Sequence, residues 1–423
     1  MAVDQVGTEE IISSRDREIL RALGRRVAEL AARDIEREKM ELWRRHNGLE
    51  NVRPVIFCSP ENGWGEIIRP EDLQCETGVG RAWENHLRME IFWAEEIKDD
   101  RVTSQSFVHG MHFTETGWGV QEKRIGGDHG GAYTWEAPIR DLDDLSVLQY
   151  PDVTPDREAT DRSLNLAHEV FDGILPVELH QTWIWTVGLT WTLVNLRGLE
   201  QVMLDMVENP EGLHRLMDFI SKGTLHRLQK LEDAGLLFLN NRNQYVGSGG
   251  YGWTDELPAE GFDGKVRMRD LWGFAESQET VGVSPAMFGE FVFPYQMPLL
   301  EKFGLNCYGC CEPVHTRWED LKTIPRLRRV SVSPWCDVAK MNELMGDRYI
   351  LSLKPNPAPL GDSVFNEDII RRELREKLEQ ARGCRVEIIM KDTHTIGGDP
   401  RRVVRWVEIA REESERAYES WNA

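Results

Sequence analysis

Apolar strand-like segments alternate with amphipathic helices along this chain from Ile174 to its end, and this alternation constrains the fold more than any other feature. The helices begin at cap-and-proline pairs such as Asn209-Pro210, Ser284-Pro285 and Asp399-Pro400. Strands separated by helices pair in parallel through right-handed crossovers. The predicted strands are VIFC, ILPVELHQ, LLFLNN, DLWGFAESQ, LNCYGCC, RRVSVSP, YILSLKP and RVEIIMKD. A set of about eight such units predicts an α/β fold of the (β/α)8 TIM-barrel type.

A doubly wound open sheet is the alternative architecture. Such sheets often carry a Gly-rich loop between a strand and the following helix, where it binds a dinucleotide or a phosphate. The only candidate here, GSGG at 247–250, lies in a loop beyond LLFLNN and opens no clear helix. We therefore favour the barrel.

The first 52 residues are predicted to be a helical extension, because Leu20, Leu23, Val27 and Leu30 recur at helical spacing. Residues 53–423 would then form the barrel. Within it, the stretch at about 60–170 is rich in tryptophan, glycine and charge and shows no clear periodicity. We interpret that stretch as an irregular elaboration inserted near the N-terminal half.

Composition restricts the partners and the compartment. The start of the chain lacks the apolar core of a signal peptide, and seven cysteines without such a signal favour reduced thiols in a cytoplasmic protein. The net charge of −21 opposes binding to nucleic acid or to an anionic membrane. We expect neither partner. A homodimer is left open.

Reactive side chains occur where the predicted strands end, which is where barrels of this kind place their active sites. In chain order they are Cys58, Glu178, His180, Asn240, Glu276, Glu279, Cys310, Cys311, Cys336, Lys354, Asp392 and His394. From this set we predict catalytic roles for Glu178, His180 and Glu279. Glu178 and His180 share one strand face because side chains alternate with a period of two. A salt-bridged structural role for Glu178 is the alternative.

The densest cluster is CYGCCEPVH at 307–315, which places three thiols, a carboxylate and an imidazole at one strand end. Soft thiolates suit zinc, and a catalytic zinc takes ligands from separate elements while keeping one position open. We predict Cys310, Cys311 and His394 as the metal ligands. Cys336 is a reserve ligand, and Cys307 is expected to be a buried small side chain. His394 could instead act as a general acid or be a loop histidine bonded to backbone.

From RDLDDLSVLQYPD through GCCEP to the end, roughly residues 130–415, the chain resembles the uroporphyrinogen decarboxylase-like superfamily. It is most similar to the corrinoid-dependent methyltransferase and demethylase branch. The decarboxylases themselves carry RQAGR near their start, where this chain has PVIFCSPENGW. The branch places His-x-Cys-Gly at a strand end, where this chain has Tyr308-Gly309-Cys310-Cys311, and a second zinc-ligating cysteine downstream, where it has Thr393 beside His394.

The resemblance implies a (β/α)8 barrel that moves a methyl group from a small methylated substrate, a methoxy-aromatic compound or a methylamine, to cobalamin. No D-x-H-x-x-G motif for holding cobalamin occurs in the sequence, so the corrinoid would be carried by a partner protein. A metal held by Cys310 and His394, with Cys311 or Glu178, would polarise the substrate heteroatom. The alternatives are a metal-independent lyase that uses Lys354 and His180, and a non-catalytic barrel that binds a ligand.

Overall fold

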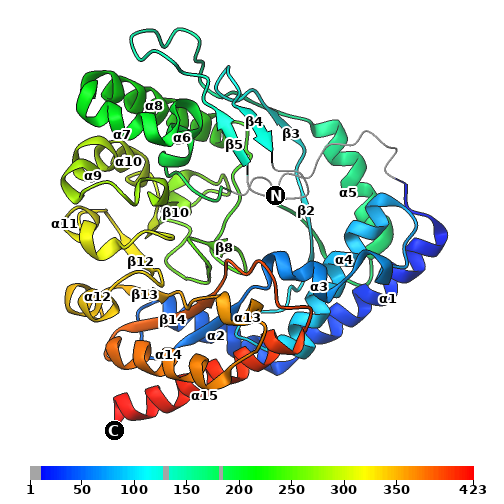
Figure 1. The fold of residues 1–423 in the computed structure, drawn as a ribbon. Coiled ribbons are helices and arrows are strands. Elements are labelled where there is room, and N and C mark those ends of the chain that lie inside the picture. Colours follow the sequence, from blue (N-terminus) through cyan, green and yellow to red (C-terminus); the bar gives the residue numbers. More distant parts are fainter. Residues whose placement is uncertain (1–10, 127–132, 181–183) are drawn as a thin grey trace.

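The structure, a computed structural model, describes residues 11–126, 133–180 and 184–423. Its largest sheet has six parallel strands in the order β1-β14-β13-β12-β11-β10 (Figure 1). These strands are β1 (Val55–Cys58), β10 (Trp272–Ala275), β11 (Leu305–Tyr308), β12 (Leu327–Val332), β13 (Ile350–Leu353) and β14 (Arg385–Met390). From β10 to β14 the order follows the sequence without the reversal of a doubly wound sheet, and the first strand lies beside the last. The predicted α/β class is confirmed, and the sheet is compatible with a barrel-like fold.

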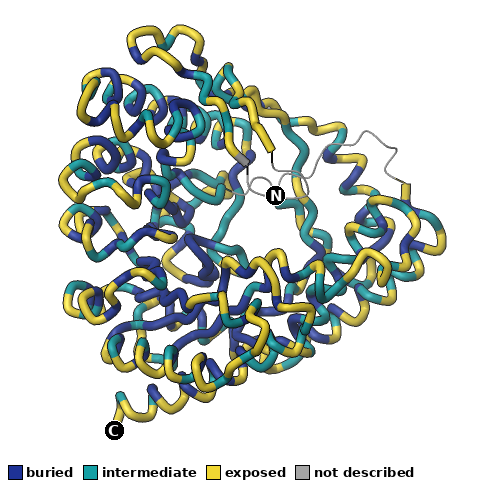
Figure 2. Tube along the Cα trace, viewed as in Figure 1, coloured by how far each residue is buried: buried dark blue, intermediate teal, exposed yellow. Residues whose placement is uncertain are grey.

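The strands are buried along almost their whole length because both faces of the sheet are covered, and only one residue of β12 and one of β14 are partly exposed. Every residue of β1, β10, β11 and β13 is buried. Strands buried on both faces have continuous apolar sequences, which explains why VIFC and the other strands of this sheet could be predicted from the sequence. Figure 2 shows this buried inner layer, with exposed residues concentrated on the surrounding helices.

Helices follow the strands on the outside of the sheet (Figure 1). Asn209 caps α8 by accepting from the amide of Gly212, and Ser284 caps α9 by accepting from that of Met287, so two of the three predicted helix starts are confirmed. At the third, Pro400 rather than Asp399 is the cap residue, and the helix begins at Arg401. The outer helices are α6 (Thr190–Arg197), α7 (Leu199–Glu208), α8 (Pro210–Asp233), α9 (Pro285–Phe291), α10 (Phe293–Leu300), α11 (Trp318–Leu321), α12 (Val338–Met345), α13 (Ala358–Gly361), α14 (Glu367–Gln380) and α15 (Arg401–Asn422).

The prediction of a strand at LLFLNN is wrong. Within 236–241 only Leu237 makes an isolated bridge, and the segment has no ladder of its own. The side chain of Asn240 takes the place of the backbone there: its Nδ2 donates to the carbonyl of Trp272 at 3.0 Å, and its Oδ1 accepts from the amide of Trp272 at 2.9 Å. The side-chain amide of Asn240 therefore holds the segment beside β10.

The stretch predicted to be irregular contains regular elements. It holds α3 (Trp64–Ile67), α4 (Gly78–Phe92) and α5 (Arg157–Phe171), and β2 (Phe107–Gly110) pairs in parallel with β7 (Val177–His180). Two short antiparallel pairs complete it: β3 (Phe113–Glu115) with β6 (Val153–Pro155), and β4 (Lys123–Gly126) with β5 (Tyr133–Glu136).

The predicted N-terminal helix is confirmed as α1 (Ser14–Ala31), with α2 (Asp34–Asn47) after it. The apolar face of α1 contributes Leu20 and Val27 to a second core, which also holds Leu87 of α4, Phe107 of β2 and Phe171 of α5. The buried Trp43 of α2 belongs instead to the main core. The two N-terminal helices thus pack against different parts of the molecule.

A small hairpin reaches the inner side chains of the sheet. Its strands are β8 (Tyr245–Val246) and β9 (Gly250–Tyr251). A Cβ placed on Gly249 would lie 2.3 Å from Ile389, and one on Gly250 would lie 2.3 Å from the guanidinium carbon of Arg329. Gly249 also has a φ of +121°, which favours glycine. The GSGG sequence therefore permits close packing of the turn against the strands, and it carries Ser248 with it.

Within the described residues, no helix combines the length and the apolar character needed to cross a membrane.

Candidate active site

Three segments that are distant in sequence meet at the carboxyl ends of the strands. Cys310 follows β11, Lys391 follows β14, and Ser248 lies on the turn of the β8–β9 hairpin. All three residues are buried. Because the sheet is parallel, its strand ends converge on one edge, as the sequence pattern predicts for an active site of this fold class. We call Cys310, Cys311, Ser248 and Lys391 the thiol site.

Two polar groups face the sulfur of Cys310. The Ser248 hydroxyl donates a hydrogen bond to Cys310 Sγ at 3.4 Å, and Lys391 Nζ lies 3.6 Å from the same sulfur. Lys391 Nζ also donates to Ser248 Oγ at 3.1 Å. This arrangement suits a negatively charged sulfur, because every group directed at it donates a hydrogen bond.

The pKa of Cys310 is lowered from its ordinary value to about 7. The hydrogen bond from the Cys311 thiol contributes most, and the charge of Lys391 and the bond from Ser248 add to it, whereas burial opposes them. Burial also opposes the charge on Lys391, but nearby Tyr245, Cys310 and Asp392 outweigh it and raise the pKa of Lys391 above its ordinary value. At neutral pH the site therefore holds a partly ionised thiol next to an ammonium group.

Cys311 differs from its neighbour although the two are adjacent. Its Sγ lies 3.7 Å from that of Cys310, but Cys311 is exposed, whereas Cys310 is only 5% exposed. The pKa of Cys311 is raised, first because it donates its proton to Cys310. Of the two thiols, Cys310 therefore ionises first.

Glu312 fixes the backbone on which Cys310 stands. One carboxylate oxygen accepts from the amide of Cys310 at 3.0 Å, and the other accepts from the amide of Ser277 at 2.9 Å and from its hydroxyl. Glu312 is fully buried. It therefore joins the ends of β10 and β11 and sets the position of the thiol.

A second buried polar network lies deeper in the sheet. Glu387 of β14 pairs with Arg329 of β12 at 2.9 Å and lies 3.2 Å from His46 of α2. Burial raises the pKa of Glu387, but Arg329, His46 and Lys354 together outweigh it and bring the pKa down to about 2. Lys354 Nζ donates to Ser352 Oγ at 2.5 Å, and Ser352 in turn bonds to Glu387. This network links α2 to the inner strands.

Burial lowers the pKa of Lys354 to about 7, against the charge of Glu387. Lys354 lies at a strand end, as predicted, but it is directed at Ser352 and is buried.

Glu276 lies at the end of β10 and is completely buried. Its Oε1 has no hydrogen-bond partner among the described residues, and its pKa is raised, first by burial and then by Glu279 and Glu312. Burial and the two neighbouring carboxylates therefore favour the protonated form of Glu276.

The predicted catalytic residues fall into two separate places. Glu178 and His180 share a face of β7, as predicted, with His180 Nε2 3.4 Å from Glu178 Oε2. The His180 ring stacks on Phe238 with ring centres 3.7 Å apart, and burial lowers its pKa despite Glu178. Glu279 follows β10 and accepts from the Thr190 hydroxyl at 2.7 Å.

The predicted zinc ligands are not brought together. His394 Nδ1 lies 3.5 Å from the side-chain amide of Asn62, and the part of the chain that the structure describes contains no group of three or more His, Cys, Asp or Glu side chains placed to hold a metal ion. Cys310 and Cys311 supply only two sulfurs, and the ammonium group of Lys391 stands beside one of them. A catalytic zinc takes three protein ligands. The described residues therefore do not fit the predicted zinc.

Cys336 and Cys307, the other two cysteines considered as ligands or as buried side chains, lie outside the thiol site. Cys336 is buried, with its Sγ 3.2 Å from His315 Nδ1, and it is not part of the thiol site. Cys307 is buried beside Gly247 and 3.7 Å from Arg329 Nη1, which confirms the expectation that it is a buried small side chain.

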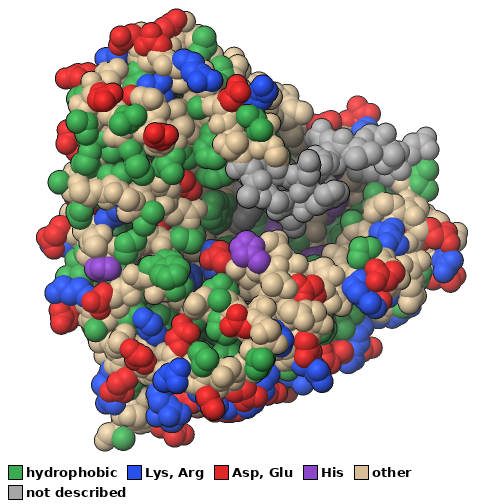
Figure 3. Space-filling view, viewed as in Figure 1, with side chains coloured by type: hydrophobic (Ala, Val, Ile, Leu, Met, Phe, Trp, Pro, Cys, Tyr) green, Lys and Arg blue, Asp and Glu red, His purple; other side chains and the backbone are tan. Residues whose placement is uncertain are grey.

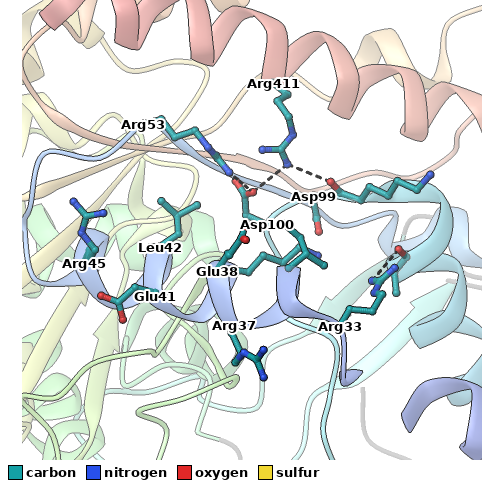
Figure 4. A pocket seen from close by; sticks show the side chains of 14 residues that line it. Arg33, Arg37, Glu38, Glu41, Leu42, Arg45, Arg53, Asp99, Asp100 and Arg411 are labelled. Carbon is teal, nitrogen blue, oxygen red and sulfur yellow. Dashed lines mark hydrogen bonds and ion pairs between the residues drawn. The ribbon is translucent and has the colours of Figure 1, made fainter. Parts of the chain in front are cut away.

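A cavity of about 850 Å³ lies elsewhere, between α2, the start of β1 and α15 (Figure 4). It is rich in arginine, but Arg53 and Arg411 both pair with the buried Asp100 at its wall. Two bonds from Arg53 fix this carboxylate, and they lower its pKa to about 2 although burial opposes this. The cavity shares no residue with the thiol site, and we interpret its charges as a structural network.

The acidic excess of the chain is dispersed. On the face drawn in Figure 3, acidic and basic side chains are interspersed over the outer helices. The net charge of −21 therefore does not appear there as one acidic patch.

Sequence reasoning missed Ser248, Lys391 and the clamping role of Glu312. The GSGG sequence was a usable signal for Ser248, because consecutive glycines mark close approach of a backbone. Lys391 is the residue before Asp392 at the end of the predicted strand RVEIIMKD, so strand-end reasoning could have included it. Nothing local indicates that Glu312 bonds to Ser277, which is 35 residues away.

Comparisons with known proteins give a distant likeness to solved structures. No family model and no curated protein matches the chain. Among solved structures, a methyltransferase from Methanosarcina mazei matches with 14% sequence identity and a TM-score of 0.45, covering 88% of this chain and 97% of that chain. A likeness this distant leaves the activity of this chain to be argued from its own residues.

Proposed function

We propose that this protein is a methyltransferase that moves a methyl group from a small methylated substrate to the corrinoid of a partner protein. The observation that supports it best is the pair of groups, Lys391 and Ser248, directed at Cys310 Sγ. A thiolate of this kind is a strong nucleophile toward an electrophilic carbon. The class of substrate, a methoxy-aromatic compound or a methylamine, comes from the family resemblance.

We further propose that the sheet closes into a barrel through the β2–β7 pair. Support comes from the chain directly after the undescribed residues 181–183, where the amide of Val187 donates to the carbonyl of Phe274 in β10 at 2.7 Å. This contact holds the segment that follows β7 beside the edge strand of the large sheet. The strand ends of β2 and β7 would then face the same opening as Cys310.

In the first step, the Cys310 thiolate attacks the methyl carbon. The new S–CH3 bond takes its electron pair from sulfur, and the bond between the methyl carbon and the substrate oxygen or nitrogen breaks with its pair on that heteroatom. The ammonium group of Lys391 donates a proton to the heteroatom and regains one from water. Protonating the leaving group in this way is general acid catalysis.

In the second step, the methyl group leaves Cys310 for the reduced corrinoid of the partner, which supplies the electron pair of the new bond. The Cys310 sulfur departs as a thiolate. Lys391 and Ser248 stabilise that charge, so the same hydrogen bonds that prepare the nucleophile also make it a leaving group. No step is assigned to zinc.

The test uses the full chain with cob(I)alamin and, as separate methyl donors, 2-methoxyphenol and trimethylamine. We expect the absorbance of methylated cobalamin to appear with one donor, and to be lost in Cys310→Ser. Cys336→Ser is the matched control, because Cys336 is a buried thiol outside the site and should keep transfer. Without cob(I)alamin, the peptide that contains Cys310 should gain the mass of one methyl group.

Transfer at the wild-type rate by Cys310→Ser would refute the thiolate mechanism. Release of carbon dioxide from a carboxylated substrate, with no methyl transfer from either donor, would favour the lyase alternative.

A further inference from the structure

The mechanism proposed above forms no bond to Cys311, although its sulfur lies 3.7 Å from the reactive sulfur and the residue is exposed. The other five cysteines, at positions 58, 75, 307, 336 and 384, are all buried. The thiol site therefore contains a pair of neighbouring thiols, of which one is exposed to solvent. Such a pair can bind a ligand that neither thiol holds firmly alone.

A ligand of this pair must be one that needs only two sulfur atoms from the protein to complete its coordination. As described above, no third His, Cys, Asp or Glu side chain joins the pair within the described residues, so a metal ion that requires three protein ligands is poorly served. The ammonium group of Lys391, 3.6 Å from Cys310 Sγ, also repels a divalent cation. A neutral, thiophilic electrophile avoids both difficulties.

We propose that Cys310 and Cys311 form a dithiol site for monosubstituted trivalent arsenicals. The organic substituent supplies the third bond to arsenic, so two thiols complete its coordination. Capture of R–As(OH)2 forms two As–S bonds and breaks two As–O bonds, and the two thiol protons leave with the hydroxyls as two molecules of water. No oxidation or reduction occurs.

The two thiols have complementary parts in this capture. Cys311 meets the arsenical first because it is exposed, and Cys310 supplies the nucleophile because Lys391 and Ser248 stabilise its thiolate. Two sulfurs on one rigid frame bind more tightly than either alone, by about 10²–10⁴-fold. An arsenical held there occupies Cys310. The inference does not depend on the proposed methyl transfer.

Phenylarsine oxide is the probe, added to the full-length reduced protein and followed by intact mass. We expect one phenylarsenic group per chain, with loss of one water, and its removal by 2,3-dimercaptopropanol but not by an equal thiol concentration of 2-mercaptoethanol. Cys311→Ser should weaken capture at least about 100-fold. That variant changes an exposed side chain, so folding is expected to be retained and is checked by circular dichroism.

Cys336→Ser is the matched control and should capture the probe like the wild type. Equal capture by Cys311→Ser, removal by 2-mercaptoethanol, or complete protection by equimolar zinc would each overturn the proposal. Methyl transfer is not measured in this experiment, so its result tests the dithiol site independently of the proposed function.

Discussion

Cys310 is held in a reactive state by groups from three parts of the chain. Its neighbour Cys311 donates to it, Lys391 approaches from the end of β14, and Ser248 approaches from the hairpin. Each group lowers the pKa of the thiol, and together they overcome the effect of burial. Reactivity here depends on tertiary contacts, so it can be changed without touching the cysteine.

The ionisation of Cys310 predicts the pH dependence of its alkylation. Because its pKa is lowered to about 7, the rate with iodoacetamide should rise with pH and reach half of its maximum near pH 7. Lys391→Met removes a positive charge and keeps the length of the side chain. The pH of half-maximal rate should then rise by about one unit, which peptide mass spectrometry at Cys310 would measure.

Lys340→Met is the control, since Lys340 is exposed and pairs with Glu343 at 2.8 Å, outside the thiol site. An unchanged pH profile in Lys391→Met would show that Lys391 does not stabilise the thiolate.

The position of Cys310 was predictable, but its environment was not. The end of a buried strand can be recognised from local sequence, and Cys310 lies there as predicted. Ser248 and Lys391 lie 62 and 81 residues away from it, and no local pattern pairs them with this sulfur. His394 is predicted as a ligand because imidazole is a familiar metal ligand, whereas in the structure its Nδ1 lies 3.5 Å from the side-chain amide of Asn62.

At the scale of elements, the β8–β9 hairpin carries the least expected part of the site. Its turn packs so closely on β12 and β14 that only glycine fits at 249 and 250. The sequence showed the glycines but not their partners. The error at LLFLNN has a related cause, because the Asn240 amide imitates a backbone pairing that periodicity alone could not distinguish from a strand.

Gly249→Ala tests the hairpin. The new Cβ would meet Ile389 at 2.3 Å, and the φ of +121° is unfavourable for alanine. We expect a loss of about 1–3 kcal/mol in the free energy of unfolding, measured by urea denaturation. Displacement of Ser248 should also raise the pH at which Cys310 is alkylated.

Gly78→Ala is the matched control. Gly78 is the first residue of α4 and has open space around its Cα, so alanine should be neutral or slightly stabilising there. If Gly249→Ala were equally neutral, the close packing of the turn would be refuted.

At the scale of the whole molecule, one buried carboxylate joins the two ends of the chain. Glu387 of β14 binds His46 of α2, 341 residues earlier in sequence, together with Arg329 of β12. All three side chains are almost fully buried. Such a network is costly to break from one side, because the remaining charge stays buried without its partner.

Glu387→Gln should therefore lower the free energy of unfolding at pH 7 by about 3–5 kcal/mol. The pKa of Glu387 is lowered from 4.5 to about 2, so its contribution is fully present above about pH 4.5 and is lost as the pH falls toward 2. The variant should accordingly lose less stability than the wild type over that interval. Urea denaturation at several pH values would measure both effects.

Glu343→Gln serves as the control, because the exposed pair of Lys340 and Glu343 is screened by solvent and should contribute little to stability. Equal stability of the two variants would show that the buried network does not link the chain ends energetically.

The pairing of β1 with β14 also has a consequence for synthesis. Val55 lies opposite Glu387, so the first strand of the sheet finds its neighbour only when nearly the whole chain has left the ribosome. Until then the apolar segment VIFC has an unsatisfied edge, and such edges invite association between chains. Contacts so distant in sequence also slow folding. A nascent chain of this protein would therefore keep the edge of its first strand open until its last strand arrives.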